Sequence, residues 1–120
     1  MKEIKAIIKP FMSDKVIQAM REFDHLPGVT VAKVTGFGHQ PLEASTEASA
    51  EASMAKLEIV VPDGLAETVV ALVATAAHTG NPGDGLIFVT NVEEVVRIQT
   101  GARGEEALEP DAPEGEGTGD

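Results

Sequence analysis

The chain has 120 residues, of which 42% are hydrophobic, with no cysteine and a formal net charge of -11. This size and composition are typical of a single domain with its own core. The lack of cysteine excludes disulfides, thiolate zinc sites and a cysteine nucleophile. Most of the acidic excess lies in residues 43–51 and 101–120, so the rest of the chain is nearly neutral. Nucleic-acid binding is excluded, because it needs a basic surface.

The sequence gives no sign of export or membrane anchoring. No run approaches the roughly 20 apolar residues that cross a bilayer. The start MKEIKAIIKP alternates charged and apolar residues instead of building a signal-peptide core. We therefore expect a cytoplasmic protein with no direct membrane insertion.

The first half of the chain predicts a strand, a helix and two further strands. Residues 2–8 alternate in polarity, which predicts a strand with one apolar face. Ser13 is expected to cap a helix, because the apolar residues after it recur at the 3.6-residue period, and Pro27 followed by glycine ends it. Residues 29–35 are rich in β-branched side chains and residues 56–61 alternate, so both predict strands.

The second half predicts one more helix and one more strand. Asp63 is expected to cap the helix, which the sequence TGNPG at 79–83 ends. Residues 86–89 form a short apolar run, and residues 93–98 are expected to continue that strand. The resulting order β-α-β-β-α-β is the α+β arrangement of a ferredoxin-like domain.

Two segments fall outside this pattern, and we expect both to be mobile. The period-four repeat LEAS-TEAS-AEAS lies in a long insertion between two strands, and its glutamates at i, i+4 spacing repel one another. Residues 109–120 are rich in acids, glycine and proline, with no large apolar side chain to bury. The predicted domain therefore spans residues 1–108, followed by an acidic disordered tail.

Five segments in this order resemble the PII nitrogen-regulatory family over roughly residues 1–108. They are IKAIIKPF at 4–11, VTGFGHQ at 34–40, KLEIVVPD at 56–63, TGNPGDGLIFV at 79–89 and VEEVVRIQTGARGEEAL at 92–108. The resemblance implies a homotrimer of ferredoxin-like subunits with adenine nucleotides bound between them. It also implies a T-loop, here residues 40–54, that reaches a protein partner such as a membrane transporter or an enzyme.

The glycines of two motifs suit a phosphate-binding cleft. Those of Gly36-Phe37-Gly38 let a ligand approach the backbone, and a turn at Gly83-Asp84-Gly85 can present N–H groups to phosphate oxygens. The resemblance assigns adenine and ribose contacts to Ile7, Thr30, Glu58 and Val60, and a phosphate contact to Arg97. Ordinary packing in the core also accounts for Ile7 and Val60. The candidate nucleotide-binding residues are Ile7, Thr30, Gly36, Phe37, Gly38, His39, Gln40, Glu58, Val60, Gly83, Asp84, Gly85 and Arg97.

Several positions depart from the family pattern. Leu86 and Gln99 stand where the family usually has phosphate-binding cations, and His39 and Met54 replace basic residues that serve triphosphate and 2-oxoglutarate. We therefore expect AMP, ADP or a cyclic nucleotide to bind at least as well as ATP, with little effect of 2-oxoglutarate. The chain has no tyrosine, so the uridylylation known in the family cannot occur.

Other functions remain open at this point. The main alternative is a trimeric interaction protein with a decayed nucleotide cleft, linked to metal efflux or inorganic carbon uptake. His25, His39 and His78 are too far apart for a local metal motif, so we expect no metal site and no obligatory cofactor. No nucleophile paired with a base is identifiable, so we expect a regulator and not an enzyme.

Overall fold

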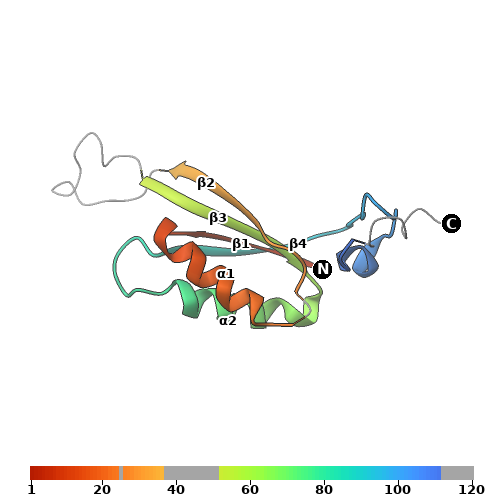
Figure 1. Ribbon diagram of the computed structural model, residues 1–120, viewed down its shortest axis with the longest axis horizontal. Helices are drawn as coiled ribbons and strands as arrows, with labels where there is room; N and C mark the ends of the chain where they lie inside the picture. Colours follow the sequence, from red (N-terminus) through yellow and green to blue (C-terminus); the bar gives the residue numbers. More distant parts are fainter. Residues whose placement is uncertain (25, 37–51, 112–120) are drawn as a thin grey trace.

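The computed structural model describes residues 1–24, 26–36 and 52–111 and has the expected order of strands and helices (Figure 1). The elements are β1 (Lys2–Ile8), the 3-10 helix η1 (Pro10–Met12), α1 (Ser13–Arg21), β2 (Thr30–Gly36), β3 (Ala52–Val61), α2 (Asp63–Ala77), β4 (Gly85–Asn91) and the 3-10 helix η4 (Gly104–Leu108). The predicted α+β ferredoxin-like fold is confirmed.

The four strands form one sheet in the order β2-β3-β1-β4, and every neighbouring pair is antiparallel. Both helices cover the same face of this sheet (Figure 1). The register aligns Ile4 with Ile59 on one side and with Val89 on the other. Because side chains alternate along a strand, this register places the apolar residues of β1 and β3 together under the helices.

The core lies between this face of the sheet and the two helices. Its largest fully buried side chains are Ile4, Ile8, Val16, Val61 and Val69. Val16 and Met20 of α1 are one turn apart, as the 3.6-residue period predicts. Alanines of α2, among them Ala66 and Ala76, are also buried, so a helix with small side chains can pack closely.

The opposite face of the sheet carries no helix (Figure 1). The register places Lys5 between Glu58 and Phe88 on this face, and Ile7 between Lys56 and Leu86. Leu86 is 65% exposed and Phe88 is 44% exposed. Exposed apolar side chains gathered on one strand are typical of a surface that another chain covers.

Neither predicted helix cap forms. Ser13 is the first residue of α1, and its hydroxyl donates to the Pro10 carbonyl at 2.8 Å, because η1 already leads the chain into the helix. Asp63 is the first residue of α2, after Pro62. Its carboxylate lies 2.8 Å from the amino group of Met1, and that contact holds the pKa of Asp63 below its usual range.

The predicted continuation of the last strand over residues 93–98 is wrong. β4 ends at Asn91, and a bridge between Val96 and Arg103 joins the chain to itself instead. The Arg97 N–H donates to the Ala102 carbonyl at 2.9 Å, and Gly101, at a φ of 77°, lets the chain reverse. Backbone N–H and C=O groups of this small hairpin form hydrogen bonds with one another, so the segment does not extend the sheet.

The remaining boundaries differ from the predictions by a few residues. β3 begins at Ala52, so the last three residues of the predicted T-loop, 52–54, lie in a strand. The rest of that loop, residues 40–51, and residues 112–120 of the predicted tail lie outside the described residues. None of the described helices is both long and apolar enough to span a membrane.

Candidate functional site

Four of the predicted site residues line a single cavity of about 610 Å³. Its walls come from Glu3 of β1, the start of β2, the end of β3, the hairpin after β4, the end of η4 and Asp111. Thr30 faces Glu58 across the β2–β3 pairing, and Val60 follows on the same face of β3. Arg97 reaches this cavity from the hairpin. A carboxylate, a hydroxyl, an apolar side chain and a guanidinium therefore meet in one place.

Arg97 is held in position by the chain that follows it. Its Nε donates to the Ala107 carbonyl at 3.0 Å, and its Nη1 lies 3.0 Å from an Asp111 carboxylate oxygen. The Arg97 side chain is 29% exposed, so its charge is still accessible from the cavity. A guanidinium fixed in this way suits an anionic ligand group.

Glu58 lies between two lysines on the open face of the sheet. Its oxygens are 4.0 Å from the Lys5 ammonium and 3.9 Å from the Lys56 ammonium. Contacts this long, on a partly exposed surface, contribute little to stability. The Glu58 carboxylate remains able to accept hydrogen bonds from hydroxyl groups of a ligand.

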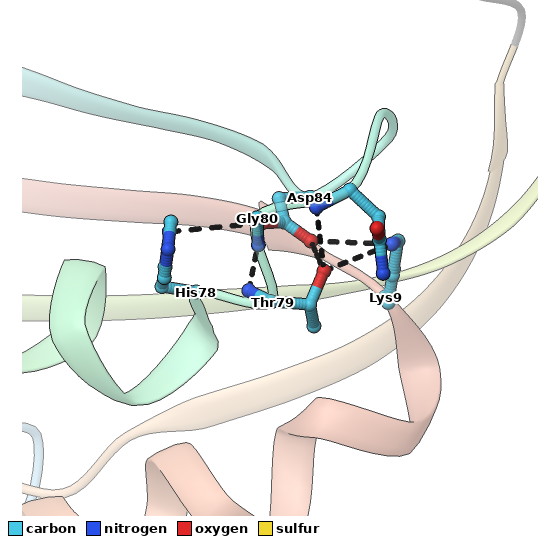
Figure 2. A network of polar contacts seen from close by, with 6 residues as sticks. Lys9, His78, Thr79, Gly80 and Asp84 are labelled. Carbon is cyan, nitrogen blue, oxygen red and sulfur yellow. Dashed lines mark hydrogen bonds and ion pairs between the residues drawn. The ribbon is translucent and has the colours of Figure 1, made fainter.

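Asp84 holds its own loop together (Figure 2). Its carboxylate accepts hydrogen bonds from the Thr79 N–H at 2.8 Å and the Gly80 N–H at 2.9 Å, and also from the Thr79 hydroxyl. The Lys9 ammonium lies 3.2 Å away, and His78 lies 3.9 Å away at the end of α2. Asp84 therefore ties the loop after α2 to the end of β1, and its predicted ligand contact stays a prediction.

Replacement of Asp84 by asparagine is expected to lower stability at neutral pH. Hydrogen bonds from the Thr79 side chain and backbone hold the pKa of Asp84 well below its usual range. A carboxylate whose pKa is lower in the folded state stabilises the fold above its unfolded pKa, and that stability is lost as the pH falls below about 4. Denaturant unfolding of native protein and Asp84→Asn should therefore differ most at pH 7.

The difference should shrink as the pH falls below about 4, where the Asp84 carboxyl of the unfolded chain begins to take up a proton while that of the folded protein stays charged. Glu67→Gln is the control, because Glu67 is an exposed carboxylate on α2. A constant difference between native protein and Asp84→Asn from pH 7 to pH 3 would contradict the role assigned to this carboxylate.

The two glycines beside Asp84 are required by the backbone. Gly83 has a φ of 90° and Gly85 a φ of 112°, both in the region that favours glycine. A Cβ atom on Gly85 would lie 1.8 Å from the carbonyl oxygen of Ile7. The motif that predicts a phosphate cradle is therefore also needed for β4 to approach β1.

The remaining candidates do not line this cavity. Ile7 and the Gly83–Gly85 segment lie at the far end of β1 from Glu3 and Val60. Gly36 ends β2 opposite Ala52, and nothing described lies within 4 Å of a Cβ built there. Phe37, Gly38, His39 and Gln40 lie outside the described residues. The described candidates thus form two groups at opposite ends of the open sheet face.

Asp111 is a charged cavity residue that sequence reasoning missed. It falls in the predicted disordered tail, yet it lines the cavity and contacts Arg97. No periodic pattern marks it, because its position depends on the hairpin folding back. Across residues 1–24, 26–36 and 52–111, no three histidine or acidic side chains gather closely enough to hold a metal ion.

Comparisons with known proteins concern the family and the fold of this chain. The family model "Nitrogen regulatory protein P-II" matches residues 1–102. Nitrogen regulatory protein P-II of Azospirillum brasilense is 45% identical over 113 residues, covering 90% of this chain and all of that protein. Nitrogen regulatory protein P-II 1 of Escherichia coli K12 is 42% identical with the same coverage. The crystal structure of Arabidopsis thaliana PII bound to citrate superposes with a TM-score of 0.76 at 36% identity, covering 88% of this chain and 90% of that one. This chain therefore belongs to the PII family of nitrogen regulatory proteins.

Proposed function

We propose that this PII-family protein senses an adenine nucleotide and regulates a protein partner in the cytoplasm. The observation that carries the proposal is the cavity shared by Thr30, Glu58, Val60 and Arg97. Val60 offers an apolar surface to a base, Glu58 accepts hydrogen bonds from ribose hydroxyls, and Arg97 binds a phosphate. Each group suits a different part of one nucleotide.

A homotrimer accounts for the separation of the candidate residues into two groups. In this arrangement Ile7 and the Gly83–Gly85 segment of one subunit complete the cavity of its neighbour. The exposed Leu86 and Phe88 side chains on the uncovered sheet face support such an assembly. Leu86 stands where the family usually has a lysine. In the trimer its side chain would face the phosphates from the second subunit.

Light scattering coupled to size exclusion is expected to show about three chains per particle. Phe88→Asp should shift the protein toward monomers, because it places a charge on the face that we expect to be buried. Ala74→Asp is the control, because Ala74 is exposed on α2, away from this face. A native protein that runs as a monomer at micromolar concentration would remove the intersubunit site.

Calorimetric titration with AMP, ADP, ATP and cyclic AMP tests the sensing function. We expect at least one of AMP, ADP and cyclic AMP to bind at least as tightly as ATP, because Leu86 and Gln99 supply no charge to the outer phosphates. Adding 2-oxoglutarate with magnesium should change ATP binding little. The expected nucleotide preference would be contradicted if magnesium-ATP bound with a low-micromolar dissociation constant and 2-oxoglutarate strengthened that binding.

The partner is proposed to contact the segment between β2 and β3. Nucleotide binding regulates such a contact only if the ligand binds two conformations of the protein with different affinity. A membrane transporter or an enzyme would be the regulated protein, reached from the cytoplasmic side. Since β3 begins at Ala52, the start of that strand connects this segment directly to Glu58 and Val60.

A second candidate is a trimeric interaction protein with no nucleotide function. It is favoured by Leu86, an apolar and 65% exposed side chain at a position where the family usually has a cation. The nucleotide titrations separate the two functions. A stable trimer that binds none of the four nucleotides would support this second candidate.

A further inference from the structure

The charges around the cavity are unfavourable for a phosphate. Among the described residues that line the cavity, Arg97 is the only cation, whereas Glu3, Glu58 and Asp111 are carboxylates. Asp111 contacts Arg97 directly, with 3.0 Å between its carboxylate oxygen and Nη1 of the guanidinium. The single positive charge among the described residues of the cavity lining is therefore already paired with a carboxylate of the same chain.

A phosphate oxygen binding to Nη1 of Arg97 would meet Asp111 at the same donor. Nη1 carries two N–H groups, but two anions bound to it together would lie close enough to repel one another. The Asp111 carboxylate must therefore move before a phosphate can take its place. Its 64% exposed side chain lies beyond η4 and outside the core, so this movement breaks no buried contact.

We propose that Asp111 is a specificity-determining residue of the cleft, an internal anion that competes with nucleotide phosphate for Arg97. This inference rests on the proposed nucleotide function. Displacing Asp111 leaves Arg97 oriented, because its Nε still donates to the Ala107 carbonyl at 3.0 Å. The competition weakens binding of every ligand that carries a phosphate.

The expected effect is modest, because both partners of the ion pair are partly exposed. Exposed ion pairs contribute up to about 1 kcal/mol, which corresponds to about a fivefold change in a binding constant. Asp111→Asn should therefore tighten ADP binding about two- to fivefold. The gain should diminish at high salt, since salt screens both the competing charge and its repulsion of phosphate.

The test compares ADP and adenosine binding to full-length native protein, Asp111→Asn and Glu109→Gln by calorimetry. Glu109→Gln is the matched control, because it removes the same charge from the same segment, and Glu109 is not among the residues lining the cavity. We expect only Asp111→Asn to bind ADP more tightly. Adenosine has no phosphate, so its affinity should be the same for all three proteins.

Each of the remaining outcomes would contradict the inference, and each would point to a different reason. Equal ADP affinity in native protein and Asp111→Asn would remove the competition and leave the nucleotide function standing. An equal gain in Glu109→Gln, or a gain for adenosine, would show a general charge effect. Failure of both native protein and Asp111→Asn to bind any of AMP, ADP, ATP and cyclic AMP would overturn the proposed function together with this inference.

Discussion

Gly85→Ala is expected to destabilise the protein by more than about 3 kcal/mol. A residue other than glycine at a φ of 112° is strained by about 1 to 3 kcal/mol. The new Cβ atom would also lie 1.8 Å from the Ile7 carbonyl oxygen, which is a main-chain atom with little freedom to move. The first β1–β4 pair, between Ile8 and Gly85, would have to separate. Denaturant unfolding at a fixed protein concentration measures this loss.

Gly64→Ala is the matched control for this substitution. Gly64 lies in the first turn of α2, with nothing within 4 Å of a Cβ atom built on it. Alanine is favoured over glycine in a helix by up to about 1 kcal/mol, so this variant should be as stable as native protein or slightly more stable. Equal unfolding midpoints for Gly85→Ala and native protein would show that β4 does not approach β1 as closely as described.

The double variant Leu86→Lys, Gln99→Arg is expected to strengthen ATP binding far more than AMP binding. Gln99 lines the cavity together with Arg97, and Leu86 lies on the open face of β4. A hydrogen bond to a charged group contributes about 1.5 to 3 kcal/mol. Two of them would add about 3 to 6 kcal/mol, or roughly a hundredfold to ten-thousandfold in affinity. The gain should fall mainly on the outer phosphates, because we propose that Arg97 binds the inner one.

Leu86→Met, Gln99→Met is the control for this variant. This control replaces Leu86 and Gln99 with an uncharged side chain. Any change in affinity that comes from losing the leucine or the glutamine is therefore also seen in the control. The measured quantity is the ratio of ATP to AMP affinity in each protein. If both nucleotides gained equally, or if the control gained as much, the two positions would not face the outer phosphates.

Most of the fold could be predicted from residue periodicity. Ile4, Ala6 and Ile8 repeat every second residue, and Val16 and Met20 are one helical turn apart, so their burial follows from local geometry. The hairpin at Val95–Gly104 could not be predicted in this way. Residues 93–98 have strand composition, and only the reversal at Gly101 decides whether they pair with the sheet or with the chain itself.

The site could be predicted in part, from the resemblance to the PII family and not from periodicity. Thr30, Glu58 and Val60 meet because the register of β2 and β3 puts them on one face, and Arg97 follows from its motif. The loop-holding role of Asp84 depends on contacts with Thr79 and Lys9 that no spacing reveals. Whether Ile7 and the glycines around Asp84 complete the cleft depends on a second subunit, which a single sequence does not position.

The most direct test of the proposed nucleotide site is an ADP titration of isotope-labelled protein, followed through backbone amide resonances. We predict shifts that saturate together at Thr30, Glu58, Val60 and Arg97, because these residues share one cavity. The groove between α1 and α2, lined by Gln18 and other residues, serves as the internal control and should not respond. Unchanged amides at all four cavity residues while ADP binds, or shifts confined to the helix groove, would contradict the account.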